Sequence, residues 1–276
     1  MEIKGKITEI RNFLSGRKGV VGFVPTMGAL HAGHLALVER CRCECDKVVV
    51  SVFVNPAQFD DPADLRNYPR TLDRDCAMLE AAGADLVFAP GATEIYPEPD
   101  TRIFDFGPLE RVMEGIRRPG HFNGVAQVVS RLFDIVKPDR AYFGEKDFQQ
   151  LAIIRELVKR EGRAIEIVGC PIVRDADGLA LSSRNTLLTP EGRAAAQHIY
   201  AVLHRAVGKG RSMPVEALKT WATGEIEKEK ELNVEYFEVV DAATLQPVAS
   251  WEAPGVKRVC VAVRDGAIRL IDNVEI

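Results

Sequence analysis

Runs of β-branched residues alternate with segments of helical period through most of the chain, and this alternation constrains the fold more than any other feature. Lys47–Val54 (KVVVSVFV) is almost continuously apolar, as expected for a parallel strand that is covered on both faces. Asn123–Val136 repeats its apolar residues at a helical period and stops before Pro138. Strands that alternate with helices pair in parallel through right-handed crossovers. We therefore predict a doubly wound, Rossmann-like α/β domain.

The same pattern predicts the other elements of this domain. We expect strands over 19–25, 85–90, 140–143 and 164–168, and helices over 33–45, 71–82 and 147–161.

The pattern changes after Pro171. We expect helices over 189–207 and 214–231, then strands over 234–240, 258–263 and 267–271. Arg264-Asp265-Gly266 would close the last two strands into a hairpin. The sequence therefore predicts a first domain over 1–173 and a smaller α+β domain over 174–276.

Composition narrows the choice of partners and compartment. The 276 residues carry a net charge of −4, which argues against binding a long nucleic acid, because such binding usually needs a net basic surface. No stretch approaches the ~18 apolar residues of a membrane span, and the charged start Met1–Lys6 is unlike a signal peptide. We expect a cytoplasmic protein with no membrane partner, whose six cysteines are reduced thiols.

The spacing Cys41-x-Cys43-x-Cys45 raises the alternative of a metal site. Zinc sites usually pair cysteines as C-x₂-C and add a second ligand pair, which this sequence does not offer. The other interpretation is a helix end with Cys41 and Cys45 on one face.

The segment Pro25–His34 (PTMGALHAGH) carries the most informative motif. It follows a predicted strand and opens a predicted helix, at the edge of the sheet where ligands bind in such folds. Gly28 and Gly33 allow close approach to the backbone, and the helix start favours an anion. His31 and His34 share one face of the first turn and can donate hydrogen bonds to phosphoryl oxygens.

Further motifs follow along the chain. They are FVNPAQF over 53–59, YPRT over 68–71, GHFNGV over 120–125, FGEKDFQQ over 143–150 and GLALSSRN over 178–185. Together with H-x-G-H, this set resembles the pantothenate synthetase (pantoate–β-alanine ligase) family, within the HIGH-type nucleotidyl transferases. One departure is Gln127, where the family pattern leads us to expect Thr.

The resemblance implies a reaction and a set of substrates. ATP and (R)-pantoate would form pantoyl adenylate and pyrophosphate, and β-alanine would then displace AMP to give pantothenate, a step of coenzyme A biosynthesis. ATP would enter as a substrate with Mg²⁺, without a tightly bound organic cofactor, and the protein would be a homodimer. Two alternatives remain at this point: another small HIGH-type adenylyltransferase, or a nucleotide-binding protein without catalysis.

The resemblance also implies roles for individual residues. His34 would be the catalytic donor toward the phosphates, Gln58 and Gln150 would bind pantoate, and Gln58 would also meet β-alanine. No protein ligand of the metal is assigned beyond Asp147 as a candidate. The implied ATP-binding residues are Met27, Gly28, Ala29, Leu30, His31, Ala32, Gly33, His34, Gly144, Glu145, Lys146, Asp147, Val173, Leu181, Ser182, Ser183 and Arg184.

Four other polar residues admit more than one role from the sequence. Arg118 and His121 would either touch phosphate or serve the structure. Asp73 and Asp75 are near enough to the motifs to suggest magnesium, but residues two apart on a helix do not share a face.

Overall fold

The computed structural model describes residues 1–59 and 62–276. The described chain forms two compact units, of which the first holds a parallel sheet and the second an antiparallel one. Unit 1 comprises Met1–Phe106, Arg117–Glu145 and Gln150–Pro171, and unit 2 comprises Gly107–Ile116, Lys146–Gln149 and Ile172–Ile276. Two short segments from the middle of the chain thus group with the C-terminal residues. The division into domains over 1–173 and 174–276 stays a prediction.

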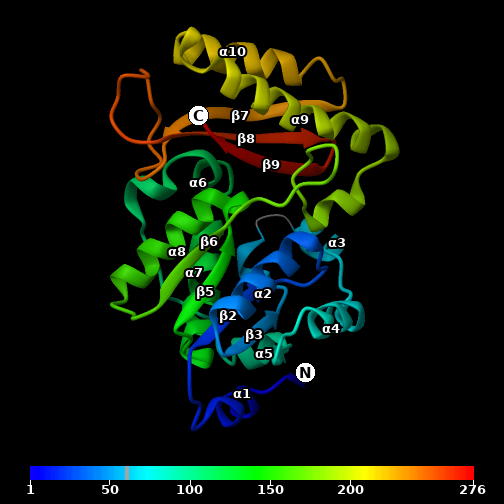
Figure 1. The fold of residues 1–276 in the computed structure, drawn as a ribbon, viewed down its shortest axis with the longest axis vertical. Helices are drawn as coiled ribbons and strands as arrows, with labels where there is room; N and C mark the ends of the chain where they lie inside the picture. Colours follow the sequence, from blue (N-terminus) through cyan, green and yellow to red (C-terminus); the bar gives the residue numbers. More distant parts are fainter. Residues whose placement is uncertain (60–61) are drawn as a thin grey trace. The chain divides into compact units, whose positions relative to one another are not determined.

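Six parallel strands form the sheet of unit 1 (Figure 1). The strands are β1 (Glu2–Lys4), β2 (Val21–Thr26), β3 (Lys47–Val52), β4 (Leu86–Phe88), β5 (Arg140–Gly144) and β6 (Glu166–Cys170). Their order across the sheet is β1-β4-β3-β2-β5-β6. The chain therefore leaves β2 toward β3 on one side and later returns to β5 on the other.

Helices cover both faces of this sheet. The helices that lie wholly in unit 1 are α1 (Ile7–Leu14), α2 (Ala32–Glu44), α3 (Pro62–Asn67), α4 (Leu72–Ala81), α5 (Ala92–Ile95) and α7 (His121–Val136). In β2, Phe23 packs edge-on against Phe133 of α7, with ring centroids 6.4 Å apart, whereas Val24 joins a buried cluster with Leu37 and Val38 of α2. Consecutive strand residues point to opposite faces, so α7 and α2 lie on opposite faces. The predicted doubly wound sheet is confirmed.

The strand order also places a topological switch point between β2 and β5, which are direct neighbours. Ligands of open α/β sheets bind at this point, beyond the carboxyl ends of the strands. The residues that follow β2 and β5 are Met27 and Glu145. Both belong to segments that the family resemblance implies bind ATP, Met27–His34 and Gly144–Asp147.

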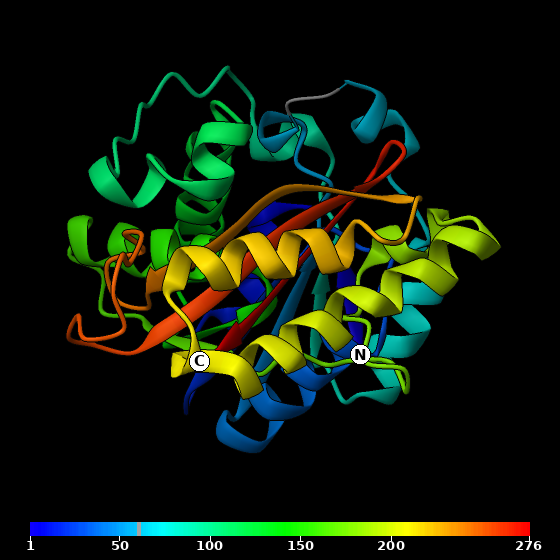
Figure 2. The same ribbon diagram turned by 90° about the horizontal axis from the view of Figure 1, so that it is seen from above.

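Unit 2 contains an antiparallel sheet in the order β7-β8-β9. Its strands are β7 (Leu232–Asp241), β8 (Lys257–Asp265) and β9 (Ile268–Glu275). The long helices α9 (Pro190–Lys209) and α10 (Val215–Ile226) pack on this sheet, and Figure 2 shows both helices lying across it. Their shared apolar core includes Val202, Leu218 and Val259, all fully buried. The predicted α+β architecture of the C-terminal half is confirmed.

Among the described residues, two α-helices contain residues of both units. They are α6 (Met113–Arg117) and α8 (Phe148–Arg160). Over the described residues, no helix is both long and apolar enough to cross a membrane.

Most predicted elements agree with the structure to within a few residues, but the helix predicted over 214–231 ends at Ile226, and α3, α5 and α6 were not predicted. The predicted strand over 164–168 is displaced to Glu166–Cys170. β1 and α1 were not predicted, because β1 has three residues and depends on pairing with β4. α1 is held at its start by the carboxylate of Glu94, which accepts from Ile7 N at 2.9 Å. The contact with Glu94 is long-range, but Ile7, Ile10 and Leu14 recur at a helical spacing, so α1 has a local pattern that the prediction missed.

The cysteine-rich segment ends α2 and packs inward. α2 ends at Glu44, and a Cβ at Gly22 would overlap the sulfur atoms of Cys41 and Cys45. Cys43 between them is exposed. Among the residues that the structure describes, no group of three or more His, Cys, Asp and Glu side chains could hold a metal ion. The helix-end interpretation therefore explains the spacing.

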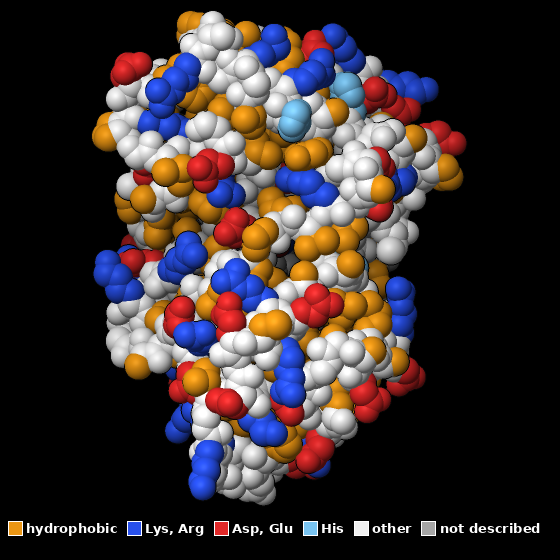
Figure 3. Space-filling view, viewed as in Figure 1, with side chains coloured by type: hydrophobic (Ala, Val, Ile, Leu, Met, Phe, Trp, Pro, Cys, Tyr) orange, Lys and Arg blue, Asp and Glu red, His pale blue; other side chains and the backbone are white. Residues whose placement is uncertain are grey.

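The face of the molecule in Figure 3 carries basic and acidic side chains interspersed with one another. Ion pairs within unit 1 include Arg40–Glu44 and Arg140–Glu166.

Candidate active site

The turn between β2 and α2 brings the two motif histidines together at a helix start. His31 caps α2: its Nδ1 accepts from Gly33 N at 3.1 Å, while His34 Nδ1 accepts from His31 N at 3.4 Å. The ring centroids are 4.1 Å apart. Because each Nδ1 accepts, the neutral form of each ring carries its proton on Nε2. Both rings are therefore set up to donate from Nε2 beside the positive end of the helix.

The backbone of this turn has a conformation that few residues adopt. Gly28 has φ +82° and Ala29 has φ +51°. A positive φ is uncommon for a residue with a side chain, such as Ala29. A Cβ at Gly28 would lie 3.0 Å from Asp75 Oδ2 and 3.1 Å from Val52 Cγ1. Glycine is thus required at position 28 for both its conformation and its contacts.

Asp75 of α4 holds the turn in this conformation. Its carboxylate accepts from Ala29 N and from Leu30 N, both at 2.9 Å, and from Thr71 Oγ1 at 3.1 Å. The residue is 1% exposed. A buried carboxylate with three donors is satisfied by hydrogen bonds, so the structure assigns Asp75 to positioning the turn rather than to magnesium.

Gln58 lies against the same turn. Asn55 follows β3 and caps the 3₁₀ helix Pro56–Gln58. Gln58 Nε2 lies 3.1 Å from Met27 Sδ, and Gln58 Oε1 accepts from Asn55 Nδ2 at 3.1 Å. Tyr96 donates to Asn55 Oδ1 at 2.9 Å, and burial raises the pKa of Tyr96 to about 12, so the phenol keeps its proton at neutral pH. These contacts fix which end of the Gln58 amide donates.

His121 and Arg118 hold the backbone at Gln58. The carbonyl of Gln58 accepts from His121 Nδ1 at 2.8 Å and from Arg118 Nη2 at 3.4 Å. Arg118 Nη1 lies 3.2 Å from His121 Nε2, so the imidazole donates from Nδ1 and accepts at Nε2. Of the two roles that the sequence left open for these residues, the structure supports the structural one.

The departure at Gln127 also has a structural explanation. Its Nε2 donates to the carbonyls of Asp100 and Arg102 at 2.9 and 2.8 Å. The side chain is buried in α7 and ties down the 100–102 segment. Gln127 therefore has a structural role in holding this segment against α7.

The segment after β5 divides between the two units. Gly144 and Glu145 belong to unit 1, whereas Lys146 and Asp147 belong to unit 2. Gln150 is half-buried in the first turn of α8, within unit 1.

The neighbouring Gln149 is buried and has a structural role in unit 2. It accepts from Glu114 N at 2.9 Å and donates to the carbonyls of Leu109 and Val112 at 2.8 and 2.9 Å. The pair Gln149-Gln150 therefore combines a structural glutamine with the predicted pantoate ligand.

The segment over 173–184 contains the remaining predicted ATP residues. Leu181 N donates to the carbonyl of Val173 at 3.0 Å, so this carbonyl already has a partner inside the protein. Ser182 caps the 3₁₀ helix Ser183–Leu187, and its hydroxyl accepts from Arg184 N at 3.3 Å.

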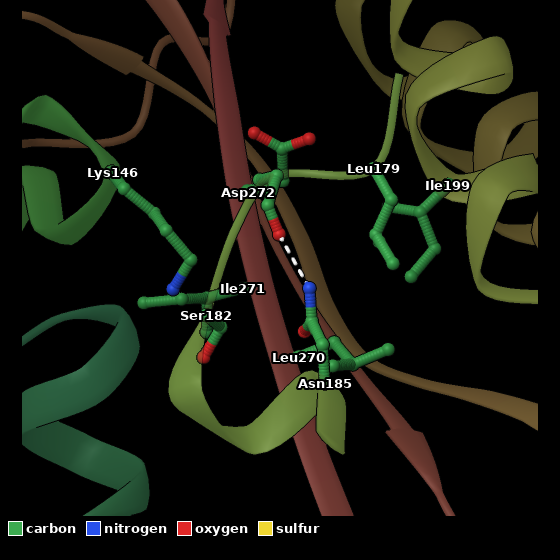
Figure 4. A pocket seen from close by; sticks show the side chains of 9 residues that line it. Lys146, Leu179, Ser182, Asn185, Ile199, Leu270, Ile271 and Asp272 are labelled. Atoms are coloured by element: carbon green, nitrogen blue, oxygen red, sulfur yellow. Dashed lines mark hydrogen bonds between the residues drawn. The ribbon is translucent and has the colours of Figure 1, made fainter. Parts of the chain in front are cut away.

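A small pocket of unit 2 brings Ser182 and Lys146 together (Figure 4). Its interior volume is about 10 Å³, enough for roughly one ordered water molecule. Asn185 closes one side and donates to the carbonyl of Ala180 at 3.1 Å. The pocket thus joins two predicted phosphate-binding segments that lie far apart in the sequence.

Unit 1 therefore joins Met27, His31, His34 and Gln58 at the switch point of a parallel sheet, beside a helix start. Glycine-containing turns of this kind bind phosphate groups. The fold and site define a nucleotide-binding α/β protein of the HIGH-type class.

Comparison with known proteins identifies the family within this class. The family model described as Pantoate-beta-alanine ligase matches residues 2–275, so the chain belongs to the pantoate–β-alanine ligase family. It is 53% identical over 279 residues to the pantothenate synthetase of Phocaeicola vulgatus, covering 100% of this chain and 99% of that protein.

Two solved structures are similar over the whole chain. The pantothenate synthetase of Thermus thermophilus matches with a TM-score of 0.94 at 48% identity, covering 100% of this chain and 99% of that one. The pantoate-beta-alanine ligase of Francisella tularensis, described as complexed with beta-gamma ATP and beta-alanine, matches with a TM-score of 0.85 at 35% identity, covering 100% and 97%.

Proposed function

We propose that this chain ligates (R)-pantoate and β-alanine to pantothenate at the expense of ATP, releasing AMP and pyrophosphate. The observation that carries the proposal is the H-x-G-H turn at the start of α2, locked by Asp75 and in contact with Gln58. Membership of the pantoate–β-alanine ligase family supports the same activity.

The first step activates a carboxylate that is otherwise a poor acylating agent. A pantoate carboxylate oxygen attacks the α-phosphorus of ATP, the bond from that phosphorus to the bridging oxygen breaks, and pyrophosphate leaves. Charge builds up on the phosphate oxygens, so fixed donors at those oxygens lower the barrier. We assign this role to His34, with the other predicted residues of Met27–Gly33 holding the nucleotide at the turn.

The second step forms the amide. The amine of β-alanine attacks the acyl carbon of pantoyl adenylate, the bond to the AMP oxygen breaks, and the amine loses a proton. Holding the amine and the adenylate together accounts for much of the acceleration expected here. Amide side chains suit this task because each offers a donor and an acceptor, which supports Gln58 and Gln150 as ligands of pantoate and Gln58 as a contact of β-alanine.

The remaining predicted residues serve the nucleotide. Lys146 and Arg184 would neutralise the β- and γ-phosphates, with Ser182 and Ser183 as hydrogen-bonding groups beside them. The other proposed ATP contacts are Gly144, Glu145, Asp147, Val173 and Leu181. Magnesium enters with ATP as part of the substrate. Asp147, which is exposed, is the one side chain that we propose as a candidate ligand of this magnesium.

The proposal extends to the setting in which the enzyme works. We assign the protein to the cytoplasm, as a homodimer that acts on small molecules and needs neither nucleic acid nor a membrane.

A stoichiometry assay tests the proposed function. Purified protein with Mg-ATP, pantoate and β-alanine should form AMP, pyrophosphate and pantothenate in equal amounts. Omission of pantoate should abolish pyrophosphate release. Formation of ADP and phosphate would contradict the adenylate, and a stable dinucleotide product would instead identify a different adenylyltransferase.

A further inference from the structure

The last strand, β9, contributes two buried polar residues to the part of unit 2 that contains Lys146. Asp272 is 6% exposed and Asn273 is 2% exposed. They lie more than a hundred residues beyond Lys146 in the sequence. In Figure 4, Asp272 and Lys146 both line the small pocket.

Asn273 holds the backbone of Lys146. Its Nδ2 donates to the carbonyl of Lys146 at 3.0 Å, and its Oδ1 accepts from Arg258 Nη1 at 2.7 Å. Arginine can only donate, so Arg258 fixes the orientation of the Asn273 amide with Nδ2 toward Lys146. The guanidinium of Arg258 also lies 4.2 Å from the ring centroid of Phe148. The segment that leads into α8 is therefore fixed to the sheet at two points, Lys146 and Phe148.

Asp272 holds a different segment. Its carboxylate makes two hydrogen bonds with Arg174, at 2.6 and 2.8 Å. Arg174 in turn donates to the carbonyl of Gly178 at 3.1 Å and lies 3.8 Å over the ring of Tyr200. Arg174 and Gly178 lie between Val173 and Leu181, whose backbones are joined by a hydrogen bond. Asp272 thus anchors the segment that carries these two predicted ATP contacts.

We propose that Asp272 and Asn273 are positioning residues for ATP: Asn273 acts through Lys146, and Asp272 acts through the Val173–Leu181 segment. The inference rests on the proposed function, because it takes Lys146 as a phosphate ligand. A lysine side chain is long and flexible, so the anchoring of its backbone decides how well its ammonium group is preorganised. Small displacements of such groups have large effects on binding and catalysis.

A double-mutant cycle on ATP binding tests the proposal. We would measure the dissociation constant of Mg-ATP by calorimetry for the wild type, Asn273→Ala, Lys146→Ala and the double variant. Asn273→Ala should weaken ATP binding roughly tenfold, the scale of one lost buried hydrogen bond. In the Lys146→Ala background, Asn273→Ala should raise the dissociation constant of Mg-ATP by less than about twofold, because the effects of two residues that act through one another are not additive.

Matched variants separate positioning from a general loss of stability. Val259→Ala on β8 removes a buried core side chain and should leave the ATP dissociation constant unchanged. Asp272→Asn should weaken ATP binding in both backgrounds, since it acts through a different segment. If Asn273→Ala does not fold, Asn273→Ser serves in the same cycle.

Two results would overturn the proposal: equal losses from Asn273→Ala with and without Lys146, or an equal loss from Val259→Ala. Pantoate-dependent exchange of labelled pyrophosphate into ATP by the wild type is measured in parallel. Its absence would contradict the proposed function, whereas the cycle on ATP binding would still decide the role of Asn273.

Discussion

Replacing Asp75 by Asn tests whether the buried carboxylate fixes the turn that carries the motif histidines. The change keeps the size of the side chain but turns one acceptor oxygen into a donor. That donor would face the N–H of Ala29 or Leu30, which now lies 2.9 Å from a carboxylate oxygen. Losing one hydrogen bond to a charged group costs about 1.5–3 kcal/mol, and the donor–donor contact prevents recovery.

The expected result is a loss of both stability and activity. At roughly 2–4 °C per kcal/mol for a protein of this size, thermal unfolding should begin about 3–12 °C lower. Because His31 and His34 depend on the turn, kcat/KM for ATP in pantoate-dependent pyrophosphate exchange should fall by roughly tenfold to a hundredfold.

Asp73→Asn provides the control. Asp73 lies on the same helix and is exposed, so the substitution makes the same change of charge without touching the turn. Wild-type melting and exchange in Asp75→Asn would refute the reasoning, as would equal losses in the two variants.

Three further predictions follow from the site and its surroundings. His34→Ala should lower kcat by ~10²–10³, the scale for one preorganised donor, with a far smaller change in ATP affinity; an unchanged kcat would remove His34 from the mechanism. Lys146→Ala and Arg184→Ala should each suppress pyrophosphate exchange. Gln150→Ala should instead raise the KM for pantoate by roughly tenfold. If Gln150→Ala changes only the KM for ATP, the proposed pantoate site is wrong. Alkylation of native protein at pH 8, followed by mass spectrometry, should modify Cys43 first, because Cys43 is exposed whereas Cys170 is buried. Burial raises the pKa of Cys170 to about 11 and so lowers its thiolate fraction; equally fast labelling of Cys170 would contradict this prediction.

The sequence predicts the parallel sheet well because each central strand carries its own signal. The β-branched run that becomes β3 has four consecutive buried residues, Val48 to Ser51, so the strand is covered on both faces. The strand β1 has no such signal, since it forms by pairing with β4 at the sheet edge. Local patterns also locate the H-x-G-H turn, because a strand, a glycine turn and a helix start are all encoded within a few residues.

The residues that hold the site are harder to predict from the sequence. Asp75 was visible as a polar residue near a motif and His121 as part of one. Their partners, Ala29 N, Leu30 N and the carbonyl of Gln58, are backbone atoms that carry no sequence signature. Asn273 is more than a hundred residues from Lys146. Contacts of this kind depend on tertiary structure, and a single sequence does not reveal them.

The fate of the pantoate carboxylate oxygens tests the central claim most directly. In the proposed reaction, the attacking oxygen stays on the α-phosphorus when β-alanine displaces AMP. Pantoate labelled with ¹⁸O in its carboxylate should therefore yield AMP that contains one ¹⁸O atom, with none in pyrophosphate, as read by mass spectrometry. Label in inorganic phosphate, or AMP without label in the presence of newly formed pantothenate, would contradict an adenylate intermediate.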